Sequence, residues 1–589
     1  MKKIIDQIKE EITKAFTEAG YDKKYAMVKL SDRPDLCQYQ CNGALAAAKE
    51  YKCAPIKIAS QVVEFLNKRD CFKEVTAINP GFINITLSEA YIAEYVNEMR
   101  KDDRFGTEKP ENPMTIIIDY GGPNIAKPLH VGHLRSAVIG ESIKRIGRFL
   151  GHKMIGDAHL GDWGLQMGLI ITELKCREPQ LPYFDSDFTG DYPEEAPFTM
   201  AELEEIYPYA SGYSKEHEEY KEEARNNTFR LQKGDKGYMA LWKHICKVSI
   251  EDLKKNYKKL NVEFELWNGE SDVETLIPEM VQYMKDKGYA YISEGALVVD
   301  VKEETDTKEV PPCMILKSDG SALYNTTDLA TIVSRVKEYK PGAIKYVVDK
   351  RQGLYFEQVF RCARKTKIVE DNTELTFLGF GTMNGKDGKP FKTRDGGVLR
   401  LEYLIQEVED AVYQKICENR NIDEKEARET AKKVGIAAIK YGDLSNQASK
   451  DYMFDLERFT SFEGNTGPYI LYTIVRIKSI LNKYKEGKGT LSPDTAIAPA
   501  ETDSEKELML EILKFNEMVE NAFGENAPHK VCQFVYDLAN AFNRFYHENK
   551  IIAESNVKKQ ESWIALIDYT LAMLNQCIEL LAIEAPDRM

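Results

Sequence analysis

The sequence of 589 residues lacks any apolar run that approaches the roughly 20 residues needed to cross a bilayer as a helix. Residues 1–6 place an acid soon after their lysines, and they contain no apolar segment of the kind found in a secretory signal. We therefore expect a cytoplasmic protein that does not contact a membrane.

Excess positive charge is also absent, because 95 acidic residues outnumber 80 lysines and arginines and give a formal net charge of −15. An acidic chain is a poor candidate for coating nucleic acid non-specifically, so we expect no DNA partner. Local basic faces can still bind RNA. Two basic clusters are more simply interpreted as solvated helix faces than as RNA contacts: Lys144, Arg145 and Arg148, and Lys254, Lys255, Lys258 and Lys259.

Cysteines with metal-ligand spacing are missing as well. The 11 cysteines are spread thinly, and the closest pair, Cys37 and Cys41, has neither a second pair nor a histidine nearby. We expect reduced thiols and no structural zinc. The residues that are present, 43% hydrophobic and 30% charged, are typical of a globular protein with about three or four domains.

Hydrophobic patterns divide the chain into parts. Residues 1–105 combine isoleucines at helical spacing with strand-like alternation at 82–87, which predicts an N-terminal α/β domain. In residues 106–405 strand-like runs alternate with helical ones, which predicts an α/β domain of the Rossmann type with a doubly wound parallel sheet. The predicted strands are 115–118, 153–155, 296–301, 345–348 and 375–378.

The rest of the chain is predicted to be mainly helical. An acidic segment with prolines and tyrosines, at about 178–238, is expected to be a surface insertion in the central domain rather than part of its sheet. From about 405 onward, one helical pattern follows another. We expect a helical linker at 406–460 and an all-helical domain at 461–589.

The most informative segment follows the first predicted strand and precedes a helical run. It comprises Pro123, Asn124, Ile125, Ala126, Lys127, Pro128, Leu129, His130, Val131, Gly132 and His133. A strand, a loop and a helix start make a phosphate site, because free N–H groups and the helix dipole favour an anion there. His130 and His133 share one side of a first helical turn, and Gly132 leaves room for a flat base. The alternative is a pair of partly buried histidines that cap a helix.

The string P-N-I-A-K-P-L-H-V-G-H-L-R-S resembles the first signature of class I aminoacyl-tRNA synthetases, in the form of the arginyl-tRNA synthetases. The resemblance implies that ATP, accompanied by Mg²⁺, activates L-arginine as an adenylate and that tRNA(Arg) then receives the arginyl group. It also implies a need for tRNA in the first step. Catalysis of this kind is mainly positioning and charge stabilisation. The candidate catalytic residues are Lys127, His130, Gly132 and His133.

A second cationic loop should close over the triphosphate. Residues 385–394 hold the comparable position, although they depart from the K-M-S-K pattern of class I enzymes. Glycines suggest mobility, and Lys389, Lys392 and Arg394 suit a phosphate clamp. Arginyl enzymes often lack the K-M-S-K pattern, and Lys127 is expected to replace the missing charge. The alternative is a glycine-rich hairpin with exposed basic residues.

A site for a guanidinium should present acidic groups with flat polar partners, because this cation is planar and always charged. Tyr324 and Asp328 lie four residues apart on one predicted helical face, and Asp119 closes the first strand. A helix cap for Asp328 and a turn for Asp119 are the alternatives. The resemblance implies that arginine is held by Asp119, Asn124, Tyr324, Asp328 and Gln352, with Glu270 as a weaker candidate.

Three further segments resemble the family. The string G-D-W-G-L-Q at 161–166 is expected near ATP or the floor of the arginine site, although Trp163 is equally suited to core packing. Residues 462–472 and 536–546 resemble a helical anticodon-binding domain, and residues 1–105 resemble the domain that meets the tRNA elbow. Aromatic and amide groups suit unstacked bases, whereas Phe542 and Phe545 are expected to pack in the core. The candidate RNA contacts are Asn465, Tyr469, Tyr546 and Met589.

Three rival functions remain at this point. The first is another nucleotidyltransferase with an H-x-G-H motif, which would have little use for an all-helical tail. The second is a class I synthetase for another basic amino acid, with lysine the nearest competitor. The third is an inactive paralogue that binds RNA, which the intact histidine motif disfavours. We expect a monomer.

Overall fold

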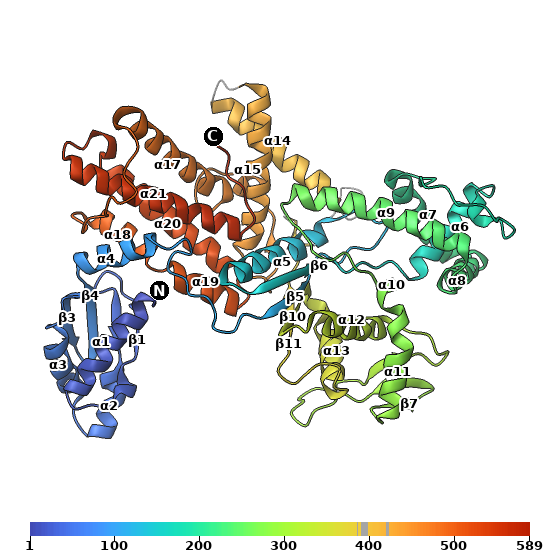
Figure 1. Cartoon of the computed structure of the whole chain (residues 1–589), viewed down its shortest axis with the longest axis horizontal. Coiled ribbons are helices and arrows are strands. Elements are labelled where there is room, and N and C mark those ends of the chain that lie inside the picture. The colour runs from blue at the N-terminus through green and yellow to red at the C-terminus, as the bar shows by residue number, and fades with distance from the viewer. Residues whose placement is uncertain (386, 390–398, 420–422) are drawn as a thin grey trace.

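The computed structural model describes residues 1–385, 387–389, 399–419 and 423–589. Its N-terminal unit is an antiparallel sheet in the order β1-β2-β4-β3 with helices packed on it (Figure 1, blue). The helical spacing predicted for this unit is confirmed, because Ile8, Ile12 and Phe16 are buried on α1. The elements are α1 (Ile4–Glu18), η1 (Lys23–Tyr25), β1 (Val28–Leu30), β2 (Tyr39–Cys41), α2 (Gly43–Tyr51), α3 (Pro55–Leu66), β3 (Phe72–Ile78), β4 (Phe82–Leu87) and α4 (Glu89–Arg100).

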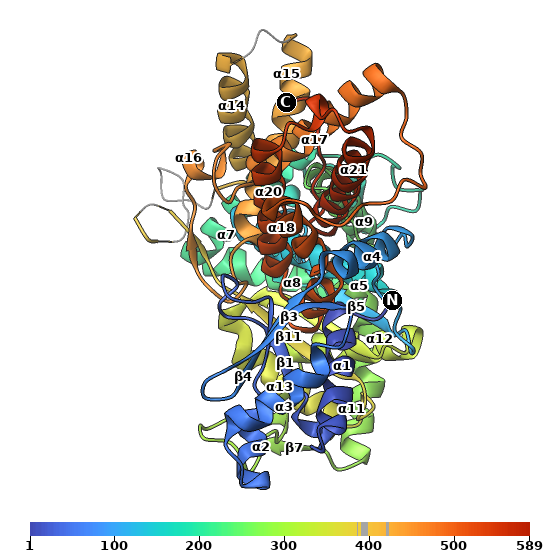
Figure 2. The same cartoon turned by 90° about the vertical axis from the view of Figure 1, so that its left-hand side faces the viewer.

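Helix α4 joins this unit to the C-terminal helices. It packs against α18 (Asp503–Ile512), and the two lie side by side in Figures 1 and 2. Asn97 Nδ2 donates to Ile497 O at 2.8 Å, and Arg100 Nη1 donates to Thr495 O at 2.5 Å. The first and last parts of the chain are therefore in direct contact.

The central sheet has four parallel strands in the order β6-β5-β10-β11, as the doubly wound prediction requires. Helix α5 connects β5 to β6, and α13 connects β10 to β11, so the strand order reverses between β5 and β10. The carboxyl edge at such a reversal is where open α/β sheets bind ligands. The elements are β5 (Thr115–Asp119), α5 (Val131–Leu150), β6 (Lys153–Asp157), α12 (Tyr324–Tyr339), β10 (Ala343–Asp349), η4 (Lys350–Gln352), α13 (Gly353–Lys365) and β11 (Glu374–Phe380).

The strand predicted at 296–301 does not belong to this sheet, and the prediction is wrong there. Strand β8 (Ala296–Val299) lies between β7 (Ala290–Ser293) and β9 (Cys313–Leu316) in a separate antiparallel sheet. A short apolar run looks the same in either kind of sheet, so its pattern does not identify its neighbours. This sheet, with α10 (Glu270–Val273), η3 (Glu274–Leu276) and α11 (Ile277–Asp286), lies below the central strands in Figure 1.

The segment between β6 and α10 forms a helical arm that projects to the right in Figure 1. Its elements are α6 (Leu165–Arg177), η2 (Pro182–Phe184), α7 (Met200–Glu216), α8 (Glu218–Gln232) and α9 (Lys236–Lys259). The residues predicted to form a surface insertion, 178–238, lie within this arm. Ser249 of α9 accepts a 3.0 Å hydrogen bond from the Ala126 N–H, so the arm contacts the loop that follows β5.

From residue 401 the described chain is almost entirely helical. Two long helices, α14 and α15, stand together at the top of Figures 1 and 2, and the remaining helices form a bundle. None of the helices in the described ranges combines the length and apolarity that crossing a membrane requires. The elements are β12 (Met383–Asn384), α14 (Leu401–Asn419), α15 (Glu424–Leu444), β13 (Tyr452–Met453), α16 (Leu456–Phe459), α17 (Gly467–Lys488), α18, α19 (Phe515–Gly524), α20 (His529–Glu548), η5 (Ile551–Ala553) and α21 (Val557–Leu580).

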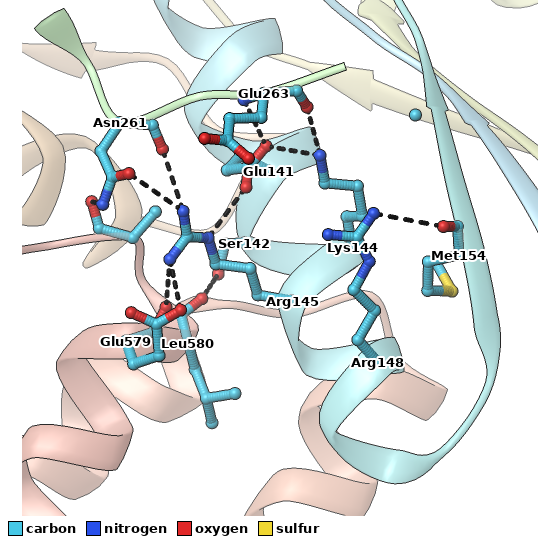
Figure 3. A network of polar contacts seen from close by, with 12 residues as sticks. Glu141, Ser142, Lys144, Arg145, Arg148, Met154, Asn261, Glu263, Glu579 and Leu580 are labelled. Carbon is cyan, nitrogen blue, oxygen red and sulfur yellow. Dashed lines mark hydrogen bonds and ion pairs between the residues drawn. The ribbon is translucent and has the colours of Figure 1, made fainter. Parts of the chain in front are cut away.

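Polar contacts tie α5 to the end of α21 and to the segment after α9 (Figure 3). Arg145 bonds Glu141 at 2.8 Å, Glu579 at 2.5 Å and Asn261 at 3.1 Å. Lys144 is wholly buried beside Glu141, so the solvated face predicted for this cluster is wrong for Lys144, whereas Arg148 is exposed as predicted. Sequence spacing did not reveal that the C-terminal helix covers α5. The second cluster, from Lys254 to Lys259, is exposed on α9 as predicted.

Candidate active site

The two histidines of the motif cap α5 with one ring nitrogen each. His130 is the N-cap residue, and its Nδ1 accepts the Gly132 N–H at 3.0 Å. The Nδ1 of His133 accepts the His130 N–H at 3.1 Å. Because each Nδ1 accepts a hydrogen bond, each neutral ring carries its proton on Nε2. Two Nε2–H donors therefore lie next to each other, with ring centroids 3.9 Å apart.

Burial keeps both rings neutral. Burial and the nearby Lys127 ammonium lower the pKa of His130, and burial with the His130 ring lowers the pKa of His133 to about 3. At pH 7 the pair can donate hydrogen bonds without carrying charge. Helix capping, the alternative role of the two histidines, thus uses only Nδ1 of each ring. Nε2 remains available to a ligand.

Glycine at 132 is required by the cap itself. A Cβ added there would lie 2.7 Å from Cε1 of His130, which is closer than a Cβ contact allows. Room for the capping ring is therefore one physical reason for this glycine. Room for a flat base, the reason predicted from the sequence, remains a prediction.

The loop before the histidines is held by the G-D-W-G segment. Ile125 N–H donates to Gly161 O at 3.1 Å, and Gly161 N–H donates to Pro123 O at 3.2 Å. A Cβ on Gly161 would collide with Asn124 Oδ1, so a larger residue at 161 would displace that side chain. Next along the chain, Asp162 accepts the Ser271 N–H at 3.0 Å on α10. The segment therefore links the histidine loop to the helix that begins with Glu270.

Trp163, in the same segment, packs rather than facing the histidines. Its ring meets Trp242 of α9 edge to face at a centroid distance of 5.3 Å. Trp242 Nε1 in turn donates to Asp162 O at 2.9 Å. Of the two interpretations of Trp163, the structure favours packing.

Lys127 reaches the arm rather than the helix N-terminus. Its ammonium lies 4.7 Å from the ring centroid of Tyr207 on α7, a cation–π contact. Glu204, on the same helix, forms a 2.7 Å ion pair with Arg400. The arm therefore touches both the histidine loop and the point where the described chain resumes after residue 398.

The predicted phosphate-clamp loop is described only in part. Lys389 is exposed in a turn whose Gly385 N–H donates to its carbonyl at 2.8 Å, whereas Lys392 and Arg394 lie outside the described residues. Val131 N–H donates to Leu399 O at 3.1 Å, and His130 pairs with Arg400 in a β-bridge. The chain that leaves this loop therefore lies directly beside the histidine pair.

Two of the predicted arginine-binding acids form a cluster near the carboxyl edge of the sheet. Asp328 is half-buried on α12 and accepts a hydrogen bond from the Tyr355 hydroxyl. Glu270 begins α10, and burial raises its pKa to about 7, with the charges of Asp162 and Asp328 acting in the same direction. Burial also raises the pKa of Asp328. Partly buried carboxylates that share a site in this way favour an incoming cation.

The predicted polar partners are more open. Tyr324 opens α12, four residues before Asp328, and its side chain is 73% exposed. Gln352 is exposed at the N-cap of α13, and Asn124 is exposed on the histidine loop. Asn124 and Gln352 follow β5 and β10, which are adjacent parallel strands, so both leave the carboxyl edge of the central sheet. Tyr324 follows β9 of the separate sheet and lies close enough to Glu270 for their charges to interact.

Asp119 has a partner that the sequence analysis missed. Its Oδ2 accepts a 2.6 Å hydrogen bond from Nη2 of Arg335, and the same Nη2 donates to Asp157 at 2.7 Å. Asp119, Asp157 and His159 have ligand atoms within 4.8 Å of one another, as a metal site would need. The guanidinium already bonds two of them. The spacing of seven residues between Asp328 and Arg335, two helical turns, was the signal that could have pointed to Arg335.

Comparisons with known proteins identify the family of the chain. The model of the class I (R) tRNA synthetase catalytic domain matches residues 95–456, that of the arginyl-tRNA synthetase N-terminal domain matches 2–87, and that of the DALR anticodon-binding domain matches 470–589. The chain is 62% identical to the arginine–tRNA ligase of Agathobacter rectalis and 59% identical to that of Alkaliphilus oremlandii, with 100% of each chain covered.

The chain belongs to the arginyl-tRNA synthetase family. A solved arginyl-tRNA synthetase from Plasmodium falciparum has a TM-score of 0.81 and 26% identity, with 100% of both chains covered. The Thermus thermophilus arginyl-tRNA synthetase, at 21% identity and a TM-score of 0.77 over 100% of both chains, has the same fold. The predicted fold class is thus confirmed, and the rival functions find no support.

The candidate RNA contacts differ in accessibility. Asn465 is exposed, and Tyr546 is 36% exposed against Arg476. Tyr469 is partly buried, and its hydroxyl donates to Asn540 at 2.7 Å, so a base would compete with an internal contact. Met589 departs from the prediction, because its side chain is 7% exposed and packs in the core.

Phe542 and Phe545, on α20, were predicted to pack rather than to bind RNA. Both are fully buried, so this prediction is confirmed.

Proposed function

We propose that this chain attaches L-arginine to tRNA(Arg) in two steps, with MgATP as the substrate of the first. The observation that supports this most directly is the placement of two kinds of group at one sheet edge. The histidines that cap α5 through Nδ1 offer neutral Nε2–H donors beside β5, and carboxylates of raised pKa lie on α10 and α12. The N–H donors suit a triphosphate, and the carboxylates suit a cationic side chain.

In the first step, an arginine carboxylate oxygen attacks the α-phosphorus of ATP, and pyrophosphate leaves as the P–O bond breaks. The protein supplies no nucleophile, because the substrate carboxylate is one already. His130 and His133 donate Nε2–H bonds to phosphate oxygens as negative charge moves onto the leaving group. Lys127 adds a positive charge when it leaves the Tyr207 ring. Lys389, Lys392 and Arg394 are proposed to close over the same phosphates.

Recognition of arginine then depends on charge and shape. Asp328 and Glu270 provide carboxylates for the guanidinium, and Tyr324 provides a flat partner. Asn124 is proposed to bind the amino-acid end, and Gln352 is proposed to line the arginine site. Glu270 must lose its proton for a full charge, so arginine binding and proton release are coupled at neutral pH. Asp119 was predicted to join them, but its bond to Arg335 gives it another role, which is developed below.

In the second step, the terminal ribose hydroxyl of the tRNA attacks the carbonyl carbon of the arginyl adenylate, and AMP leaves. The helical domain proposed at 461–589 would bind the anticodon, with Asn465, Tyr469 and Tyr546 as contacts. The domain at 1–105 would meet the tRNA elbow, and a linker at 406–460 would join the catalytic and anticodon domains. Protein synthesis places such an enzyme in the cytoplasm, where we propose that it acts as a monomer.

The test is the exchange of labelled pyrophosphate into ATP, with arginine or lysine as the amino acid and with or without tRNA(Arg). We expect exchange with arginine in the presence of tRNA and none with lysine. Absence of exchange with arginine and tRNA would contradict the proposal. Exchange with lysine at a similar rate would contradict the role given to the carboxylates.

A further inference from the structure

Arg335 forms the most deeply buried charge cluster near the proposed arginine site. Its side chain is 3% exposed, and those of its partners Asp119 and Asp157 are 10% and 1% exposed. One guanidinium nitrogen, Nη2, donates to both carboxylates at 2.6 and 2.7 Å. Charge-assisted bonds of this length in a buried setting are among the strongest that side chains make.

The cluster connects α12 to three strands at the same level. Asp119 and Asp157 are register partners at the carboxyl ends of β5 and β6. Tyr346 on β10 is the register partner of Asp119 on its other side, and its ring lies 5.4 Å from the guanidinium. Arg335 comes from α12, two helical turns after Asp328, so both side chains leave the same face of that helix. The bonds of Arg335 therefore fix where α12, and with it Asp328, lies over the sheet edge.

Stability alone does not explain this arrangement. A buried ion cluster is often no more stable than apolar residues of the same volume. Here Nε and Nη1 of Arg335 are buried without a protein partner within the described residues, which adds a desolvation cost. A cluster with this cost needs a function in specificity or positioning.

We propose that Arg335 is a positioning residue for substrate recognition. It engages Asp119 and Asp157, anchors α12, and leaves Asp328 and Glu270 as the carboxylates that receive the substrate's guanidinium. This inference rests on the proposed function. It changes the role of Asp119 from a substrate ligand to a partner of an arginine of the protein itself.

The sign of the electrostatic effect follows from the groups around the cluster. The positive charge of Arg335 lowers the pKa of Asp328, whereas the negative charge of Asp119 raises it. Asp328 and Glu270 influence each other, so their protonation is a property of the pair. The titratable groups that face the cluster are Asp119 of β5, Asp157 of β6, His159 after β6, Glu270 of α10, Asp328 and Tyr339 of α12, Tyr346 of β10 and Tyr355 of α13.

Two opposite substitutions test the proposal in the full-length enzyme with tRNA present. Arg335→Gln removes the positive charge, and we expect the KM for arginine to rise at least about ten-fold with little change in the KM for ATP. The acidic limb of the pH profile, which is the fall of kcat/KM for arginine at low pH, should move up by about one pH unit. Asp119→Asn keeps an oxygen that can accept from Arg335 but removes a negative charge, so the same limb should move down. A purely structural role would not move the limb in opposite directions.

Arg361→Gln is the matched control. Arg361 on α13 is also held by carboxylates, with Asp306 at 2.7 Å, but it does not bond the cluster. We expect its arginine KM and its pH profile to remain those of the wild type. If Arg335→Gln does not fold, the direction of the shift in Asp119→Asn decides the question alone.

A chemical rescue gives a second readout. Arg335→Ala leaves Asp119 and Asp157 without their cation, and added guanidinium ion should restore part of the activity. In the wild type the same ion should only inhibit, because it competes with the substrate. Absence of pyrophosphate exchange by the wild type with arginine and tRNA, and without added guanidinium, would overturn the proposed function. If the wild type exchanges normally, three results would each overturn this inference instead. They are an unchanged arginine KM in Arg335→Gln, a lack of rescue in Arg335→Ala, and a shift of the limb in the same direction in Arg335→Gln and Asp119→Asn.

Discussion

His133 offers the sharpest test of the site, because its two ring nitrogens have separable roles. Nδ1 accepts the His130 N–H at 3.1 Å, and Nε2–H is the proposed phosphate donor. In His133→Asn the amide oxygen can replace Nδ1, while nothing replaces Nε2–H. Loss of one preorganised donor to developing charge costs about 3–4 kcal/mol, or about 10²–10³ in kcat. Stability should change by less than about 1 kcal/mol, because the cap is kept.

His133→Ala should lose both functions, so it adds a cap loss of about 1 kcal/mol to the same fall in adenylation. The assays are arginine-dependent pyrophosphate exchange, arginine binding by calorimetry and unfolding in urea. We expect arginine binding to survive in both variants.

The matched control is His152→Asn. The Nδ1 of His152 also accepts a backbone N–H, from Met114 at 3.3 Å, but this histidine follows the far end of α5. It should exchange at the wild-type rate. Near-normal exchange by His133→Asn would refute the donor role of Nε2–H, whereas equal losses in His133→Asn and His152→Asn would point to folding.

Four further outcomes are expected. Asp328→Asn should weaken arginine binding by about 2–3 kcal/mol in calorimetry, since one charge-assisted bond is lost; an unchanged Kd would exclude the contact. With its pKa near 7, Glu270 should make arginine affinity rise about ten-fold from pH 6 to 8, and a flat profile would contradict its role. Gly161→Ala should displace Asn124 and raise the arginine KM about ten-fold, whereas a wild-type KM would show that the loop adapts. Arg145→Ala should lower the free energy of unfolding in urea by about 3 kcal/mol, because the ion pair of Arg145 with the buried Glu141 is broken; no change would argue against a stabilising role for this pair.

Much of the site could be predicted from the sequence because its residues follow strands at short range. The histidine motif lies within 15 residues of the end of β5, where a strand, loop and helix must place it at the sheet edge. Asp328 and Glu270 were found by chemistry, since a flat cation needs carboxylates. The antiparallel assignment of 296–301 could not be predicted, because an apolar run carries no information about which strand will pair with it.

The buried side chains were the part that the sequence predicted least well. Lys144 has the composition of a solvated residue and yet is wholly buried, because the segment after α9, more than 100 residues later, lies against it and accepts its hydrogen bond at Glu263 O. Met589 was proposed as an RNA contact and packs in the core for the same reason. Burial is a sum over contacts that are distant along the chain, so local spacing does not determine it.

By itself, the sequence determined the family, the parallel sheet and the place of the histidine loop at a helix start, because each depends on groups that are close along the chain. Only the tertiary structure decided the protonation of the histidines and the partner of Asp119. Asp119 and Arg335 are 216 residues apart, and their bond exists because α12 packs across the strand ends. Hydrogen-bond partners and desolvation, which set charge and protonation state, arise only when distant segments pack together.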